Sequence, residues 1–366
     1  MRIGINALFL IPGGVGGTEV YLRNLLAALA LAPRNHQYVV FLNQETDASL
    51  LPPHPAFLPI QTGVRAVSRP SRILYEQHLF PLAARRAHID VMLNPGFTAP
   101  LFLHCPNVTI IHDLQHHHHP EYFKPADLLA WRFFVWSAAR FSAQVITVSP
   151  ASTEDVINVY KRSPQHVHTA EPGVEPALFD LTNHPEPLIL CVSTLHPHKN
   201  IERLIDAFAL FHPRHPEYTL VLAGMRGFHT QAVESRIAGH QLQSKITLTG
   251  WIPRPEILAL YARAQFAVFP STFEGFGIPV VEALAAGVPL ITSDIRPMKD
   301  IAQGAALLFP PNDTQALLAA MEAYAASPAL RAANVARGRP LARNYSWHRT
   351  AQITLNTLEH TGDSTL

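Results

Sequence analysis

Cysteine and charged residues are both scarce in this sequence. The 366 residues include only Cys105 and Cys191, far apart in the chain, so we predict no disulfide framework and expect a reducing compartment. Charged residues make up 15% of the chain, against about 25% in typical proteins. The formal net charge is +1. The chain therefore has no overall field that would attract nucleic acid, and we expect no nucleic-acid partner.

Long apolar runs are also missing. No apolar stretch reaches the roughly 20 residues that a membrane-spanning helix needs, and Met1–Asn6 leads into a predicted strand without the pattern of a signal peptide. We therefore expect a cytoplasmic protein and keep open a peripheral contact with the inner face of a membrane. Hydrophobic residues still make up 48% of the chain, which is enough for two domains of ordinary size.

Predicted strands and helices alternate along both halves of the chain. This alternation predicts the α/β class, with two doubly wound domains. We place the first domain at residues 1–183, the second at 184–345 and a final helix at 346–366. A proline-containing loop at 180–187 marks the predicted boundary. Residues 44–70, which are rich in proline and polar residues, are predicted to form a loop.

The most informative stretch is a strand, a glycine loop and a helix. Phe266–Phe269 is an apolar strand, Pro279 suits the first turn of a helix, and Gly287 ends that helix. Unpaired amides and the helix dipole together make the start of such a helix attractive to an anion. The amides that we expect to point at the anion belong to Gly275, Phe276, Gly277 and Ile278.

Two carboxylates flank this predicted anion site. Glu274 lies in the loop, and Glu282 is predicted to lie in the first turn of the helix. A carboxylate beside a phosphate is poorly suited to bind it, but ionised carboxylates accept strong hydrogen bonds from hydroxyl groups. The pattern therefore predicts a nucleotide sugar, with Glu274 on the sugar and Glu282 on the ribose. The alternative is that Glu282 only favours the start of the helix.

The stretch from Ser271 to Pro289 resembles the Glu-x7-Glu signature of the retaining glycosyltransferases of family 4, which have the GT-B fold. The resemblance extends over roughly residues 1 to 355, and the segments Arg72–Gln77 and Ile89–Pro95 are similar to the mannosyltransferase-type branch. It implies two Rossmann-like domains facing across a cleft, with the donor mainly on the second domain. It also implies that the final helix crosses back to the first domain.

A basic residue beside the donor diphosphate is the next feature that the resemblance implies. Lys199 follows a predicted strand, and a fixed cation there would stabilise the charge that develops on the leaving diphosphate. Many family members carry an arginine five positions before this lysine or directly before it, where this chain has Thr194 and His198. Arg226 is a candidate replacement. The alternative for Lys199 is an exposed lysine at a helix start.

Two further loops resemble donor-binding loops of the family. Gly16 and Gly17 lie between the first predicted strand and helix, where glycine lets the backbone approach a ligand closely. They resemble the family's N-terminal glycine loop, and the alternative is a plain tight turn. Trp251 and Ile252 lie in a turn resembling the one that holds the base, largely through its backbone.

A histidine ends the strand Val108–Ile111, at the edge where parallel sheets place their chemistry. His112 and Asp113 resemble the family's HD motif, which implies that His112 lies near the anomeric carbon of the donor. The run His116–His119 allows a metal interpretation. Four adjacent histidines cannot all face one ion, however, and the family needs no metal. We therefore predict a polar loop there, with no metal and no cofactor.

These observations predict a retaining glycosyltransferase of polysaccharide biosynthesis, with His112, Lys199 and Glu274 as its catalytic residues. It would move a hexose, mannose being favoured and GDP-mannose the favoured donor, to a saccharide or lipid-linked saccharide. Because no carboxylate is evident as a nucleophile, we expect front-face substitution assisted by the leaving phosphate.

Several alternatives stay open. A sugar-nucleotide epimerase of the GT-B fold would need no acceptor, and the altered basic pair leaves room for a non-catalytic scaffold. Three arginines, Arg65, Arg69 and Arg72, could meet a phosphorylated or lipid-linked acceptor, or they could form a solvated surface.

Overall fold

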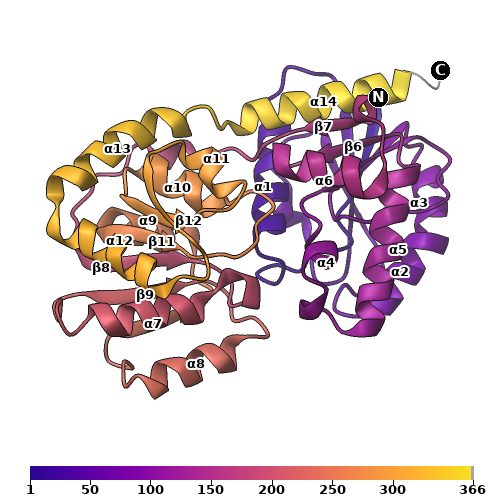
Figure 1. Ribbon diagram of the computed structural model, residues 1–366. Coiled ribbons are helices and arrows are strands. Elements are labelled where there is room, and N and C mark those ends of the chain that lie inside the picture. Colours follow the sequence, from indigo (N-terminus) through magenta and orange to yellow (C-terminus); the bar gives the residue numbers. More distant parts are fainter. Residues whose placement is uncertain (364–366) are drawn as a thin grey trace. The chain divides into compact units, whose positions relative to one another are not determined.

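The computed structural model describes residues 1–363, which form two compact units (Figure 1). The first unit contains residues 1–173 together with the chain from Trp347 onward, and the second contains Val174–Ser346. The predicted boundary at residues 183 and 184 lies later than this division. The reason is local, because Val174 donates a backbone hydrogen bond to Tyr345 and Leu178 is fully buried.

The first unit is built on a seven-stranded parallel sheet in the order β3-β2-β1-β4-β5-β6-β7. Its strands are β1 (Arg2–Asn6), β2 (Gln37–Leu42), β3 (Phe57–Gln61), β4 (Val91–Asn94), β5 (Asn107–Ile111), β6 (Gln144–Thr147) and β7 (Val167–Thr169). Its helices are α1 (Gly17–Ala30), α2 (Arg69–His78), α3 (Phe80–Arg86), α4 (Gln115–His118), α5 (Pro125–Phe141), α6 (Pro150–Tyr160) and α14 (Trp347–Asp363).

Strand β3 corrects the prediction of a loop over residues 44–70. Phe57–Gln61 pairs in parallel with β2 at the edge of the sheet. Leu58 and Pro59 are exposed, and proline is compatible with an edge position because one side of the strand lacks a partner. The segment therefore lacks the continuous apolar pattern by which the buried strands could be recognised.

The second unit has a six-stranded parallel sheet in the order β10-β9-β8-β11-β12-β13. Its strands are β8 (Glu186–Val192), β9 (Thr219–Ala223), β10 (Ile246–Gly250), β11 (Ala264–Phe269), β12 (Leu290–Ser293) and β13 (Ala306–Phe309). Its helices are α7 (Ile201–Phe211), α8 (Thr230–Gly239), α9 (Arg254–Arg263), α10 (Ile278–Ala286), α11 (Met298–Ala302), α12 (Thr314–Ala326) and α13 (Pro328–Ala342).

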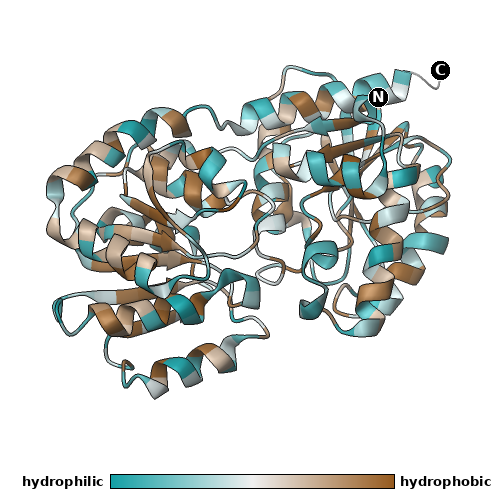
Figure 2. Cartoon of the chain, viewed as in Figure 1, coloured by the Kyte–Doolittle hydropathy of each residue, from teal (hydrophilic) through white to brown (hydrophobic). Residues whose placement is uncertain are grey.

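The central strands are apolar along their whole length because helices cover both faces of each sheet. Val39–Leu42 and Phe266–Phe269 are buried at every position, and Figure 2 shows the strands as the most hydrophobic part of each unit. Helix α14 packs on α1 and on strands β4 and β5 of the first unit. The predicted class, two Rossmann-like α/β domains, is confirmed. No helix among residues 1–363 is both long enough and apolar enough to cross a membrane.

Candidate functional site

The candidate site of the second unit lies at the carboxyl ends of β8 and β11, which are neighbours in the sheet. The chain order reverses between these two strands, and ligands of such sheets bind at that point. Two hydrogen bonds join the loops that follow the strands. The Asn200 side chain donates to the Pro270 carbonyl at 3.0 Å, and the Thr272 amide donates to the His198 carbonyl at 2.7 Å. Residues distant in the sequence are thereby held together.

An ion pair stands at the centre of this site. The Lys199 Nζ atom lies 2.7 Å from Glu274 Oε1, with 21% and 14% of the two side chains exposed. The Ser271 hydroxyl donates to the same oxygen at 2.7 Å. Within residues 1–363, the chain gives Glu274 Oε2 no hydrogen-bond donor. This second oxygen is therefore the one placed to accept a hydroxyl group of a ligand.

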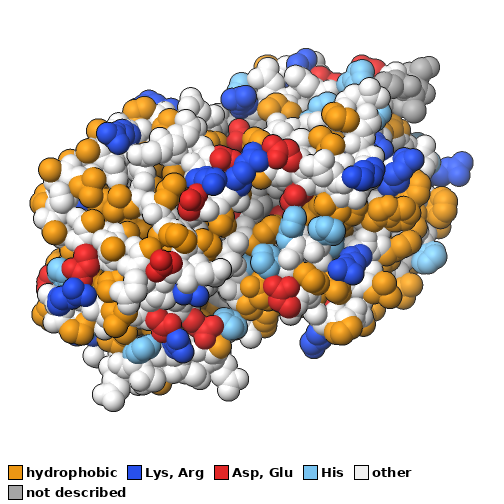
Figure 3. Space-filling model, viewed as in Figure 1, with side chains coloured by type: hydrophobic (Ala, Val, Ile, Leu, Met, Phe, Trp, Pro, Cys, Tyr) orange, Lys and Arg blue, Asp and Glu red, His pale blue; other side chains and the backbone are white. Residues whose placement is uncertain are grey.

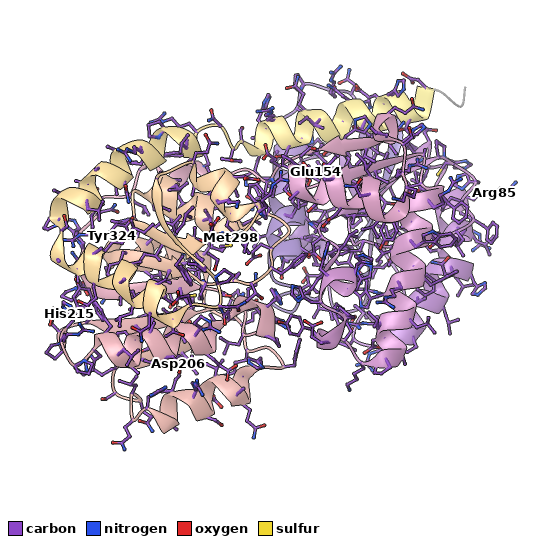
Figure 4. All side chains as sticks on the ribbon, in the orientation of Figure 1. Arg85, Glu154, Asp206, His215, Met298 and Tyr324 are labelled. Carbon is purple, nitrogen blue, oxygen red and sulfur yellow. The ribbon has the colours of Figure 1, made fainter. Side chains whose placement is uncertain are left out.

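The ion pair lines a small pocket that also reaches the start of α10. Met298, labelled in Figure 4, belongs to its wall. The other lining residues are Cys191, Val192, Ser193, Phe269, Pro270, Ser271, Gly277, Pro279 and Val280. A lysine and a carboxylate at one wall and a helix start at another give the pocket both donors and acceptors.

The start of α10 is open to an anion. Gly277 precedes the helix with φ 109° and ψ 55°, a left-handed conformation that favours glycine. The first turn carries no acidic residue and no side chain caps it. In the described part of the chain, the amides of Gly277 and Ile278 have no acceptor. The Phe276 amide also lacks an acceptor among the described residues, so three of the four predicted donors are unpaired. The ring of buried Phe276 packs against Tyr345, with centroids 5.6 Å apart, and Gly275 has other contacts.

Glu282 differs from the prediction. It lies in the second turn of α10 rather than the first, and only 5% of the residue is exposed. One carboxylate oxygen is 2.7 Å from an Arg254 guanidinium nitrogen, and the other accepts a hydrogen bond from the Tyr261 hydroxyl at 3.0 Å. Burial raises the pKa of Glu282, while Arg254 opposes that shift. The carboxylate is therefore anchored by its own chain, and its contact with a ribose stays a prediction.

The remaining donor-side residues lie on loops after β8, β9 and β10. The Leu195 amide donates to the Met225 carbonyl at 3.1 Å, so the first two of these loops are in contact. A Cβ atom on Gly224 would lie 2.2 Å from the Ser193 carbonyl oxygen, and glycine is therefore required there. The main chain of Thr194 accepts the Ser193 hydroxyl.

Two of these side chains are largely exposed. Arg226 is 64% exposed and pairs with Glu234 at 3.1 Å, so its predicted role as a second cation gains no support from its contacts. Trp251 is 64% exposed, and Ile252 is half-buried.

His112 of the first unit follows β5, at the edge where the sequence predicts it. Its Nε2–H donates to the Pro95 carbonyl at 2.9 Å, and its ring lies 5.0 Å from each of the Tyr21 and Phe97 rings. Burial lowers the pKa of His112 to about 4. The imidazole is therefore neutral at pH 7, and Nδ1 is its hydrogen-bond acceptor.

The N-terminal glycine loop precedes α1, as predicted. Gly16 has φ 58° and ψ −129°, and α1 begins at Gly17. The Gly13 amide donates to Glu19 Oε2 at 2.8 Å, and Arg23 lies 2.8 Å from Oε1. This loop is therefore closed by an acid of its own helix. That Gly16 and Gly17 bind the donor stays a prediction.

Two protein-family descriptions match the chain in succession. Glycosyltransferase Family 4 matches residues 15–178, and Glycosyl transferases group 1 matches residues 179–339. The chain belongs to glycosyltransferase family 4. The family recognised from the motifs is thus confirmed.

Bacterial glycosyltransferases are among its relatives. O-antigen chain mannosyltransferase B of Escherichia coli is 27% identical over 68% of this chain and 69% of the relative. O-antigen chain mannosyltransferase RfbU of Salmonella typhimurium is 26% identical over 59% of this chain and 60% of the relative. A glycogen synthase of Mycobacterium tuberculosis is 27% identical over 73% of this chain and 66% of the relative. The matches therefore cover about three fifths to two thirds of these relatives.

Solved structures show the same GT-B fold. Sucrose-phosphate synthase from Thermosynechococcus elongatus superimposes with a TM-score of 0.81 at 19% identity and covers 100% of both chains. HepE from Anabaena, solved in complex with UDP-glucose, has a TM-score of 0.75 at 19% identity and covers 98% of this chain and 100% of its own. The fold of this glycosyltransferase is thereby confirmed.

The histidine run of the glycosyltransferase is divided among different partners. His116 Nε2 is 2.8 Å from the Tyr160 hydroxyl, and His118 Nε2 is 2.9 Å from Asp155. His119 Nδ1 lies 2.9 Å from Glu121. The side chains diverge, and residues 1–363 contain no cluster of three His, Cys, Asp or Glu side chains that could hold a metal.

Three residues that shape the site were not predicted: Ser271, Arg254 and Tyr261. Ser271 lies within the recognised motif, three positions before Glu274, and that spacing is a usable signal. Arg254 and Tyr261 lie on α9 and meet Glu282 only through tertiary packing. No local pattern points to that contact.

Proposed function

We propose that this chain is a retaining hexosyltransferase that uses a nucleoside diphosphate sugar. The observation that carries the proposal is the Lys199–Glu274 ion pair at 2.7 Å, beside the open amides of Gly277 and Ile278. The site thus combines one fixed cation, one hydroxyl acceptor and one helix start. A diphosphate and a sugar joined by one bond would engage all three.

The proposed roles follow from the charge of each group. The diphosphate would approach Lys199 and the α10 amides, because both favour the negative charge that grows as the glycosidic bond breaks. Glu274 would accept a sugar hydroxyl through Oε2, its other oxygen being held by Lys199 and Ser271. The ion pair would keep both side chains in position before the donor arrives.

His112 would act on the acceptor side of the reaction. Its neutral imidazole, fixed by the Pro95 carbonyl, has a lone pair at Nδ1 that can accept a hydrogen bond from a hydroxyl group and so orient it. Because Glu274, the carboxylate that lines the pocket, is assigned to a sugar hydroxyl, we propose front-face substitution in which the leaving phosphate receives the acceptor proton. The new bond would keep the configuration of the broken one.

Mannose is the proposed sugar and GDP-mannose the proposed donor. The support comes from similarity to O-antigen chain mannosyltransferases of Escherichia coli and Salmonella typhimurium. We propose a saccharide or lipid-linked saccharide as the acceptor and polysaccharide biosynthesis as the process.

The test is a donor panel on the purified chain. Calorimetry with GDP-mannose, UDP-glucose, GDP and UDP should show binding of GDP-mannose, and Glu274→Gln should weaken its transfer but not GDP binding. Release of GDP should depend on an added saccharide, and the product should keep the donor's anomeric configuration. Epimerised nucleotide sugar without an acceptor would instead identify an epimerase. Absence of binding to every nucleotide would overturn the proposal.

A further inference from the structure

The first unit carries apolar side chains on its surface in unusual number. Sixteen large hydrophobic side chains are exposed among residues 1–363, and nine of them lie between Val67 and Phe141. Single exposed apolar residues are ordinary, but a continuous group marks a surface that contacts something other than water. The exposed groups lie mainly on α2, α3 and α5.

Helix α5 shows the pattern most clearly. Leu129, Phe133, Trp136 and Arg140 recur at the spacing of one helix face, and all four are exposed. Their face is opposite in character to that of a usual surface helix, which presents polar residues to solvent. The Phe133 and Trp136 rings lie 6.1 Å apart, and the Trp136 and Phe141 rings lie 5.6 Å apart. An aromatic cluster is therefore already assembled on the surface.

Helices α2 and α3 extend this surface. They pack against each other, and α2 is joined to α5 because Arg69 lies 4.0 Å from Asp127 and 5.9 Å from the centre of the Trp131 ring. Figure 3 shows hydrophobic and basic side chains intermingled over α3 and α5, and Arg85 projects outward in Figure 4. We call this surface the basic apolar face. Its exposed members are Leu74, Leu82, Arg85, Arg86, Leu129, Phe133, Trp136 and Arg140.

The charge of these segments is one-sided. Residues 65–88 and 124–141 contain eight lysines and arginines and two acids, while the rest of the chain has 20 basic and 25 acidic residues. One of the two acids, Glu76, is buried and accepts hydrogen bonds from Asn6 and Thr98. Arg72, one of the eight basic residues, is also largely buried and offsets the charge of Glu76, which leaves seven basic residues for the surface. The other acid, Asp127, is the one beside Arg69. The surface is thus positive within a chain that is otherwise slightly negative.

We infer that the basic apolar face docks on the surface of an anionic lipid bilayer. Aromatic side chains fit the boundary between headgroups and acyl chains, and each basic side chain near a negative membrane contributes about 1 kcal/mol. A protein partner would need a matching apolar acidic surface, whereas a membrane supplies both properties over any area. The inference does not depend on the donor or the sugar of the proposed reaction.

Vesicle flotation tests the inference on the full chain. The chain should float with phosphatidylcholine vesicles that contain about a third phosphatidylglycerol and should stay unbound with phosphatidylcholine alone. Binding should fall at about 0.5 M salt because screening weakens surface attraction. The reversal Arg85→Glu/Arg86→Glu should reduce the partition coefficient at least about 30-fold, taking about 1 kcal/mol for each lost cation.

Two matched controls belong to this test. Arg337→Glu/Arg343→Glu makes the same charge change in the second unit, at Arg337 of α13 and at Arg343 just after this helix. Leu210→Ser removes an exposed apolar side chain of the second unit. Both should bind vesicles like the wild type. Phe133→Ser on the basic apolar face should bind at least about tenfold less. Equal losses in face and control variants would overturn the inference.

Tryptophan fluorescence gives an independent measure of how deeply the basic apolar face inserts into the bilayer. Trp136 is 40% exposed in the free protein, so its emission should shift to shorter wavelength when anionic vesicles are added. The shift should disappear in Trp136→Phe and persist in Trp251→Phe. No shift in the wild type would overturn the inference. Self-association through this face without vesicle binding would show that a second copy rather than a membrane covers it.

Discussion

The two glycine loops of this glycosyltransferase have the same arrangement but differ in the acidic side chains near the helix start. Each follows a strand and precedes a helix, and each has a glycine with positive φ at the helix start, Gly16 in one and Gly277 in the other. In the first loop, Glu19 from the first turn of α1 accepts a hydrogen bond from the Gly13 amide. In the second, α10 has no acid in its first turn. The start of a helix can bind an anionic ligand only when no acidic side chain of its own first turn already occupies that place.

The ion pair enlarges this difference. Lys199 and Glu274 lie beside the second loop within one pocket, whereas the cation at the first loop, Arg23, belongs to the same helix as Glu19. We therefore expect the second loop to hold the donor phosphates and the first to be chiefly structural.

Removing the cation of the second loop should have the largest effect. Lys199→Ala should lower kcat by about 10²- to 10³-fold, because a fixed charge at the leaving group acts mainly in the transition state. A transfer assay at saturating donor measures this. Lys245→Ala, which removes a surface lysine whose Nζ donates to the Pro216 carbonyl, should keep nearly full activity. A Lys199→Ala enzyme at half the wild-type rate would remove the basis for placing the diphosphate here.

Arg254→Ala should cause the largest loss of stability among the site variants. It leaves the buried Glu282 carboxylate without its charge partner, and breaking such pairs costs up to about 3–5 kcal/mol. Because the Arg254 side chain is 33% exposed, we expect about 2–4 kcal/mol in urea unfolding. Arg263→Ala at the end of the same helix breaks only the surface pair with Glu186 and should cost under about 1 kcal/mol. Equal losses would mean that the Glu282 pair is solvated.

Replacing one glycine of each loop by alanine distinguishes backbone strain from the loss of a ligand contact. Gly277→Ala places a side chain at φ +109° and should cost about 1–2 kcal/mol in thermal or urea unfolding. Gly17→Ala has no atom within 4 Å of the new Cβ and should leave stability unchanged or slightly higher. A raised donor KM in the otherwise stable Gly17→Ala enzyme would show that the first loop also approaches the donor, which would contradict the contrast.

Uncapping the first loop should have the smallest effect. Glu19→Gln removes the negative charge of the side chain that accepts the hydrogen bond from the Gly13 amide. The change should lower the free energy of unfolding by about 0.5–1 kcal/mol. Glu256→Gln removes a first-turn acid of α9 to which no loop amide donates among residues 1–363, and it should cost less. Denaturant titration of both variants compares them. A transfer rate that fell with Glu19→Gln, at unchanged stability, would assign this acid to the reaction.

The sequence predicted much of the architecture because buried parallel strands are apolar throughout. Phe266–Phe269 and Tyr38–Leu42 were recognisable for this reason and lie in β11 and β2. Strand β3 was missed because an edge strand has fewer buried positions. The distance between Glu274 and Glu282 along the chain was visible, but the surroundings of each were not. One carboxylate lines a pocket, while the other is buried against α9.

By itself, the sequence determined the alternation of strands and helices, the glycines that permit the two loops, and the residue types beside them. Only the tertiary structure decided that Lys199 meets Glu274 and that Arg254 meets Glu282. The physical reason is that these contacts depend on the order of strands in the sheet, which places β8 beside β11. That order arises from packing over the whole unit, whereas hydrophobic periodicity and turn residues act only between near neighbours in the chain.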